Sequence, residues 1–294
     1  LQAENAEYIQ LDEPFLALNL THKERGAFTK VYNEINARFP KLKVILANYF
    51  DCFGENLETA LALPVDTFHL DLVRCPLQLD DILESGKLAS NVNLSLGVVD
   101  GRNIWKNDFK KSLELIKKAT DALGENRILI APSCSLIHSP CDLDLETNDQ
   151  TLTPEIKQWL AFAKQKINEI VLLKQFASGE VDVKNSVDYE RNIIANDNRK
   201  TSKLIHNNEV KARVAGITAS DDKRKSTFAT RRKSQIKALN LPLFPTTTIG
   251  SFPQTAEVRS WRAKFKKGEL TTEQYNDLIE KETEAAIRFQ EETG

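Results

Sequence analysis

The sequence predicts an α/β fold of the (βα)8 TIM-barrel type, in which parallel strands alternate with helices. Short apolar segments rich in β-branched residues recur along the first half of the chain, and longer segments with helical periodicity separate them. Each apolar segment ends in polar or small residues, as barrel strands do where their carboxyl ends form the functional face. The five strands that can be recognised are fewer than a closed barrel needs. We therefore expect the carboxyl-terminal part of a first barrel, followed by the start of a second.

The expected strands and helices alternate along this half of the chain. The strands are Tyr8–Leu11, Lys43–Tyr49, Thr67–Val73, Val92–Val99 and Ile128–Ala131, and the helices between them are Glu24–Phe39, Asn56–Leu63, Asp80–Leu88 and Asn107–Leu123. This alternation is typical of βα units around a parallel sheet. Five strands alone leave two unpaired edges, which soluble proteins avoid. An open doubly wound sheet is the alternative arrangement.

The second half of the chain is mainly helical in pattern. A long amphipathic helix is predicted over Thr153–Phe176, because Thr153-Pro154-Glu155 is a typical helix start and apolar residues then recur with helical spacing. Residues 178–240 are polar and lack strand patterns. A short buried strand is expected at Ile249, followed by helices over Thr255–Lys267 and Thr271–Thr293.

These patterns divide the chain into three parts. Residues 1–177 are expected to form the carboxyl-terminal five βα units of an amino-terminal barrel, residues 178–244 a helical inter-domain connection, and residues 245–294 the first strand and helices of a second, truncated barrel. The chain contains no Met at all, which indicates an internal piece of a longer protein or a sequence that has lost residues. Because its sheet edges would be unpaired, self-association of such a piece is a reasonable hypothesis.

Charge and composition argue against several classes of function. The 40 basic and 42 acidic residues nearly cancel, so the chain as a whole favours neither nucleic acid nor membrane as a partner. The segment 199–237 carries twelve Lys or Arg and three acidic residues; its scarce aromatics and alternating apolar positions favour a solvated helix face over a nucleic-acid arm. No apolar run reaches the roughly 18 residues that span a bilayer. Four scattered cysteines predict no disulfide framework and fit a cytoplasmic protein.

Carboxylates at the strand ends are candidate acid–base groups. Asp12 and Glu13 follow the first strand and Asp71 lies at the end of the third, where a barrel hydrolase would place its acid and base. Adjacent residues of a strand point to opposite faces, so Asp12 and Glu13 cannot both enter one cleft without a turn. The structural interpretation, in which these carboxylates are bonded to neighbouring loops, is favoured over the catalytic one.

Cys134, His138 and Cys141 place three possible zinc ligands within eight residues. No fourth ligand is near, and their spacing matches no common structural zinc pattern. Buried cysteines beside a hydrogen-bonded histidine are the favoured interpretation.

The most informative segment is 245–255, which reads Pro-Thr-Thr-Thr-Ile-Gly-Ser-Phe-Pro-Gln-Thr. A strand that ends at Gly250-Ser251 can hold a small carboxylate or amine, since unpaired amides point outward and the hydroxyl is free to bond. Together with Phe265-Lys266-Lys267-Gly268, the segment resembles the opening of the catalytic domain of cobalamin-independent methionine synthase. Further segments are similar to the amino-terminal domain of that family: Gln10-Leu11-Asp12-Glu13-Pro14, Asp100-Gly101-Arg102-Asn103 with Trp105, and Ser133-Cys134-Ser135-Leu136 with His138-Ser139-Pro140.

The resemblance implies an enzyme that moves a methyl group from 5-methyltetrahydropteroyltri-L-glutamate to L-homocysteine, with zinc holding the sulfur as a reactive thiolate. It implies that Ile249, Gly250 and Ser251 bind homocysteine, and that the zinc ligands lie beyond residue 294. No catalytic or metal-binding residue of the family falls within this sequence. The parent enzyme is expected to be a monomer and the isolated fragment to be inactive. A strand-end hydrolase and a non-catalytic scaffold remain the alternatives.

Overall fold

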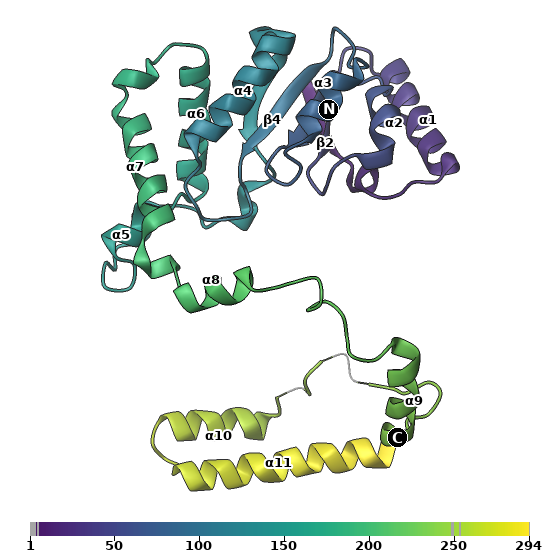
Figure 1. The fold of residues 1–294 in the computed structure, drawn as a ribbon, viewed down its shortest axis with the longest axis vertical. Coiled ribbons are helices and arrows are strands. Elements are labelled where there is room, and N and C mark those ends of the chain that lie inside the picture. The colour runs from purple at the N-terminus through teal and green to yellow at the C-terminus, as the bar shows by residue number, and fades with distance from the viewer. Residues whose placement is uncertain (1–3, 5, 248–249, 253, 294) are drawn as a thin grey trace. The chain divides into compact units, whose positions relative to one another are not determined.

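The computed structural model describes all residues except 1–3, 5, 248–249, 253 and 294 (Figure 1). The chain divides into two compact units, residues 1–211 and residues 212–294. Among the described residues, no helix combines the length and the apolar character needed to cross a membrane.

A five-stranded parallel sheet forms the centre of the first unit. Its strands lie side by side in chain order: β1 (Tyr8–Asp12), β2 (Lys43–Asn48), β3 (Thr67–Asp71), β4 (Asn93–Val99) and β5 (Ile128–Pro132). All five strands expected from the sequence are thus confirmed, with boundaries shifted by a few residues. An α/β fold with a parallel sheet is therefore established.

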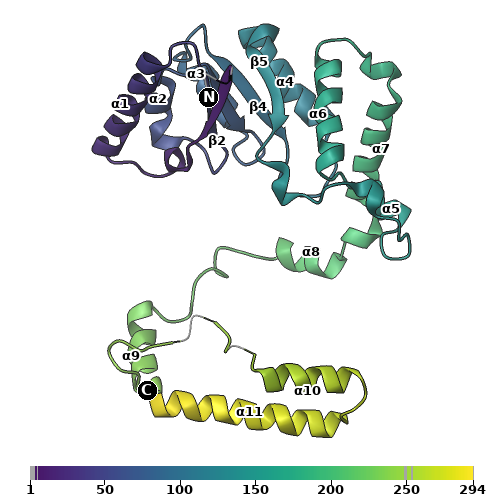
Figure 2. The same cartoon turned by 180° about the vertical axis from the view of Figure 1, so that it is seen from behind.

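Helices follow the first four strands and cover one face of the sheet. They are α1 (His22–Arg38), α2 (Leu57–Leu61), α3 (Gln78–Ser85) and α4 (Phe109–Leu123), and Figure 1 shows them in front of the strands. From behind, the strands themselves face the viewer (Figure 2). Since these four helices all lie on the same side, they form a single layer on one face of the sheet.

Side chains alternate between these two faces of the sheet. On the helix-covered face, Leu46, Phe68 and Leu94 lie in one row of the pairing register and are fully buried. The neighbouring row carries polar side chains, among them His69 and Ser95, which are paired across β3 and β4. The apolar row forms the main core with the helices, because a strand presents successive residues to opposite faces.

The prediction of one long helix over Thr153–Phe176 is wrong, because the structure has two helices there, α5 (Pro154–Lys157) and α6 (Ala163–Ala177). Between them the backbone is extended and pairs with the loop that follows β4: Lys106 N–H donates to the carbonyl of Trp159 at 2.8 Å, and Ala161 N–H to that of Ile104 at 2.9 Å. Burial of Leu160 and Phe162 beside this bridge favours the break over a continuous helix.

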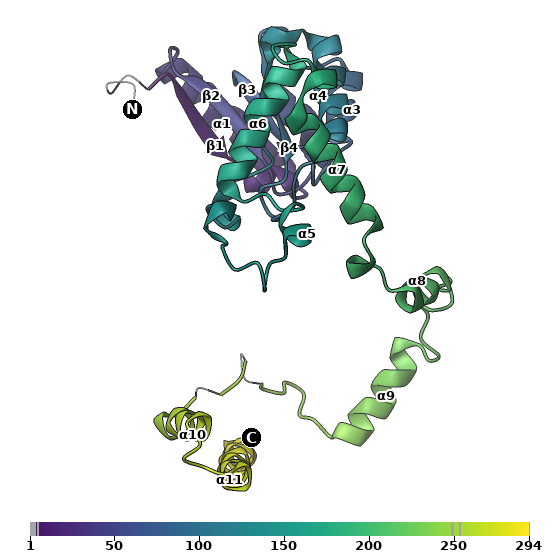
Figure 3. The same ribbon diagram turned by 90° about the vertical axis from the view of Figure 1, so that its left-hand side faces the viewer.

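The remaining helices begin with α7 (Val187–Thr201), which packs on α4, and α8 (Asn208–Ala215). In the second unit, α9 (Phe228–Leu239) precedes a pair formed by α10 (Ala256–Lys266) and α11 (Thr272–Thr293), seen nearly end-on in Figure 3. The helices expected at the end of the chain are confirmed. Short 3-10 helices lie at Pro14–Ala17, Gly54–Asn56, Glu125–Arg127, Leu136–His138, Leu143–Leu145, Val183–Asn185 and Lys203–Ile205.

The expectation that no disulfide forms is wrong for one pair of cysteines. Cys52 and Cys75 are joined by a disulfide, and their Cα atoms lie 5.4 Å apart. Cys52 follows β2 and Cys75 follows β3. These strands are parallel neighbours, so the loops after them meet at the same sheet edge although the two cysteines are separated in sequence.

Candidate functional site

The carboxyl ends of β3 and β4 are joined by an ion pair. Arg102 Nη1 lies 2.6 Å from Asp71 Oδ2, and Arg102 Nη2 also donates to the carbonyl of Tyr49. The other oxygen of this buried carboxylate, Asp71 Oδ1, accepts the backbone N–H groups of Val73 at 3.0 Å and Arg74 at 2.8 Å. Both oxygens of Asp71 are therefore occupied by groups of the protein, which supports a structural role for this carboxylate.

Asp12 and Glu13, at the end of β1, bond to different partners. Tyr49 Oη donates to Asp12 Oδ2 at 2.6 Å, while Tyr32 Oη donates to Glu13 Oε1 at 2.6 Å. The bond to Asp12 raises the pKa of Tyr49 to about 12. Burial raises the pKa of Tyr32 well above the usual value of a tyrosine. Asp12 and Glu13 therefore belong to different hydrogen-bond pairs, and the structure does not join them as one acid–base pair.

His69 lies on the polar row of β3, and both of its ring nitrogens are hydrogen-bonded. Its Nδ1 lies 2.9 Å from Ser95 Oγ and its Nε2 lies 3.1 Å from the carbonyl of Ser133. Burial lowers the pKa of this imidazole, so it is neutral near pH 7 and orders the strand ends. A Cβ on Gly97 would lie 2.6 Å from the carbonyl oxygen of Leu70, which explains why glycine is needed beside this histidine.

The residues considered as zinc ligands do not converge. Cys134 is buried, and burial raises the pKa of its thiol, whereas Cys141 is exposed. His138 lies in the short 3-10 helix between them. Within the described ranges, no group of three or more His, Cys, Asp or Glu side chains is placed to hold a metal ion. The described residues therefore offer no fit for zinc.

A buried charged cluster surrounds the start of α6, and sequence reasoning missed it. Glu169 is 6% exposed, and its Oε1 accepts the backbone N–H of Asn107 at 2.9 Å. Lys166 Nζ donates to the carbonyl of Trp105 at 2.9 Å and to Asn103 Oδ1 at 3.2 Å. Burial raises the pKa of Glu169 to about 7 and lowers that of Lys166. Charged residues at helical spacing usually indicate a solvent-exposed helix face. Only the folded structure therefore shows that Lys166 and Glu169 are buried.

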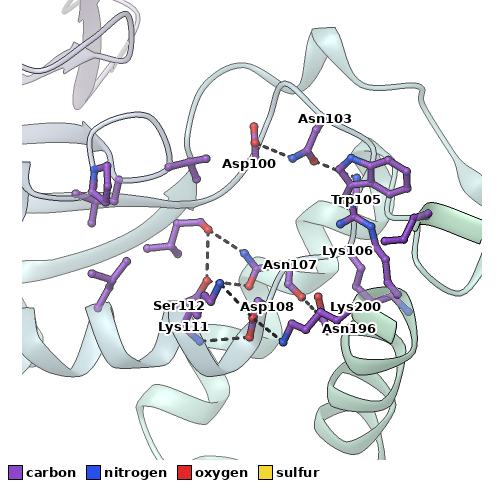
Figure 4. Close-up of a pocket in the computed structure, with 17 residues that line it drawn as sticks. Asp100, Asn103, Trp105, Lys106, Asn107, Asp108, Lys111, Ser112, Asn196 and Lys200 are labelled. Carbon is purple, nitrogen blue, oxygen red and sulfur yellow. Dashed lines mark hydrogen bonds and ion pairs between the residues drawn. The ribbon is translucent and has the colours of Figure 1, made fainter. Parts of the chain in front are cut away.

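A pocket lies beside this cluster, at the carboxyl ends of β3 and β4 (Figure 4). The loop after β4, the start of α4 and the end of α7 supply its polar residues, including Trp105, Lys106 and Arg199. The sequence offered one signal, the polar run that follows β4. It could not place Arg199 next to Trp105, because that contact depends on how α7 packs against α4.

The residues expected to bind homocysteine are placed only in part. Ile249 lies outside the described residues. Gly250 and Ser251 are exposed and form a bend. The described residues just before them, 245–247, are not in a strand. The expected strand is therefore not seen at these described positions. A strand needs a neighbouring strand to pair with, and the described residues of the second unit contain none.

The parallel sheet, its single helix layer and its polar strand ends define an α/β protein in which βα loops form a common face. Comparison with known proteins specifies the family. Residues 1–124 match the family described as cobalamin-independent synthase, N-terminal domain, and residues 244–294 match that described as cobalamin-independent synthase, catalytic domain. The chain belongs to the cobalamin-independent methionine synthase family, as its resemblance indicated.

Three relatives illustrate how far the similarity extends. Proteins named 5-methyltetrahydropteroyltriglutamate–homocysteine methyltransferase from Flavobacterium johnsoniae, Cytophaga hutchinsonii and Saccharomyces cerevisiae are 93%, 54% and 44% identical to it over 294 residues. All of this chain is covered in each comparison, but only 38%, 38% and 37% of the respective relative. The chain thus spans little more than a third of the length of these curated relatives. A solved structure of a putative vitamin-B12 independent methionine synthase from Listeria monocytogenes aligns over 61% of this chain and 50% of its own, with a TM-score of 0.42 and 12% identity.

Proposed function

We propose that this chain is part of an enzyme that transfers a methyl group from 5-methyltetrahydropteroyltri-L-glutamate to L-homocysteine, forming methionine. The observation that carries the proposal is the similarity of the whole chain to relatives that bear this name. The reaction breaks a carbon–nitrogen bond of the folate and forms a carbon–sulfur bond. Because the departing nitrogen must gain a proton, an acid is needed besides the thiolate, and no described residue of this chain is assigned to that role.

Residues 1–177 are proposed to be the carboxyl-terminal five βα units of an amino-terminal TIM barrel. Their single helix layer supports this arrangement, as do the free edges at β1 and β5. Residues 178–244 would be the connection and residues 245–294 the start of the catalytic barrel. Strands from the rest of such a protein would pair with the two free edges and cover the polar face of the sheet.

Homocysteine is proposed to bind at Ile249, Gly250 and Ser251. A Cβ on Gly250 would meet no atom of the described residues within 4 Å, which leaves room on that side for a ligand to approach the backbone closely. The exposed hydroxyl of Ser251 is a donor and acceptor that suits the charged amino-acid end of the substrate.

Zinc is the metal proposed for this reaction, with all of its ligands beyond residue 294. In this proposal the chain contributes residues that bind substrate, and the longer protein supplies the zinc ligands. The parent enzyme is proposed to be a cytoplasmic monomer.

Substitution of Ser251 tests the site in the longer protein that contains this chain. Ser251→Ala is expected to raise the KM for homocysteine about tenfold, the equivalent of one hydrogen bond to a charged group, and to leave the KM for the folate substrate unchanged. Ser260→Ala is the matched control, because Ser260 is exposed on the outside of α10. Unchanged homocysteine kinetics in Ser251→Ala would contradict the assignment.

A further inference from the structure

The pocket at the ends of β3 and β4 has the size and the walls of a small-molecule site. Its volume is about 610 Å3, within the range of roughly 300–1,000 Å3 that is common for ligand sites. Apolar residues form much of its wall: Leu72, Val73, Pro76, Val98, Leu115 and Ile205. A ligand that fits here would therefore have an apolar part.

Two cations of the pocket form no direct ion pair among the described residues, although Glu169 attracts one of them, Lys106. The other, Arg199, lies over the ring of Trp105, with 3.8 Å between the guanidinium carbon and the ring centroid. Among the described residues, neither this guanidinium nor the Lys106 ammonium forms an ion pair or a hydrogen bond. Burial lowers the pKa of both groups, so a bound anion would relieve the cost of keeping them charged.

Two further cations of the pocket already have carboxylate partners. Lys111 and Lys200 both lie 3.8 Å from the same oxygen, Asp108 Oδ2 (Figure 4), and Lys200 also lies 3.4 Å from Asp197 Oδ1. The second carboxylate of the pocket, Asp100, is engaged by the side-chain amide of Asn103 at 2.7 Å. A ligand could therefore pair with the two cations that have no direct ion pair.

We propose that this pocket binds a small phosphate monoester whose organic part is apolar. The phosphate would accept hydrogen bonds from Arg199 and Lys106, because guanidinium and ammonium groups are the usual phosphate partners in proteins. The apolar part of the ligand would lie against Leu72, Val98 and Leu115. No residue of this pocket is among those proposed to bind homocysteine, so the two sites are tested separately.

Phenyl phosphate is the probe for this site, used with the full chain and followed by the NMR signal of the Trp105 indole N–H. Saturable shifts are expected with phenyl phosphate, at concentrations at least about tenfold below those needed with inorganic phosphate or with phenol alone. Arg199→Gln and Lys106→Gln should each raise the Kd about tenfold, the effect of removing a charged hydrogen-bond partner. Lys23→Gln, at an exposed position of α1, is the control and should leave the Kd unchanged.

Three results would overturn the proposal. Absence of saturable binding to the wild-type chain would remove the site. Equal affinity for inorganic phosphate would show that the apolar wall plays no part. An unchanged Kd in both Arg199→Gln and Lys106→Gln, with the helical content of each variant intact by circular dichroism, would place the ligand elsewhere.

Discussion

The buried carboxylate of Glu169 predicts an unusual pH dependence of stability. Its Oε2 is buried and, among the described residues, has no hydrogen-bond partner. Burial raises the pKa of Glu169 from 4.5 to about 7, in spite of the attraction of Lys166 and Lys106. In the unfolded chain the same carboxyl titrates near its ordinary pKa. Between these two values the folded protein holds a proton that the unfolded chain has lost.

The sign and the size of the effect follow from this difference. A raised pKa means that the contribution to stability is fully present below about pH 4.5 and is lost as pH rises through about 7. The difference corresponds to about 3 kcal/mol, most of which is lost between about pH 5 and about pH 8. Glu169→Gln keeps an oxygen for the Asn107 N–H and cannot ionise, so it escapes this loss.

Urea denaturation of wild type and Glu169→Gln at about pH 5 and about pH 8 measures the effect. Relative to Glu169→Gln, the wild-type free energy of unfolding should fall by about 2 kcal/mol or more between the two conditions. Glu114→Gln on the exposed side of α4 is the control and should follow the wild type. If the difference between wild type and Glu169→Gln did not change with pH, Glu169 would not be a buried, proton-binding group.

Other substitutions test the core, the strand-end ion pair and the disulfide. Leu94→Ala removes a fully buried side chain and should destabilise the first unit by about 3 kcal/mol in urea denaturation; a loss below about 1 kcal/mol would contradict its place in the core. Arg102→Ala leaves the buried Asp71 carboxylate without its charged partner and should cost about 2–3 kcal/mol near pH 7, and a loss below about 1 kcal/mol would contradict the ion pair. Peptide mapping without reductant should recover Cys52 linked to Cys75, and finding both as free thiols would argue against the disulfide.

Much of the first unit could be predicted from local patterns. Each strand is a short apolar segment with a polar end, so β1 to β5 could be recognised without knowledge of their neighbours. The break between α5 and α6 could not, because apolar residues continue through Trp159, Leu160 and Phe162 at positions that also suit a helix. Those side chains are buried by pairing with the loop after β4, a contact between distant segments.

One candidate site could be recognised from the local sequence, and the others depend on contacts between distant segments. Ser251 was found because its surrounding segment resembles a known family, and nothing in the described geometry of the second unit would have singled it out. The pocket of Lys106 and Arg199, the cluster around Glu169 and the Cys52–Cys75 disulfide all join segments that are far apart in sequence. Their chemistry depends on burial and proximity, which a residue pattern does not record.

The most direct test of the proposed function is a side-by-side assay of methionine formation. The isolated 294-residue chain and the longer protein that contains it would be supplied with homocysteine, 5-methyltetrahydropteroyltri-L-glutamate and zinc, without cobalamin. The longer protein should form methionine, and the isolated chain should form none, because the proposed zinc ligands lie beyond residue 294. Methionine formation by the isolated chain, or its absence in the longer protein, would contradict the proposal.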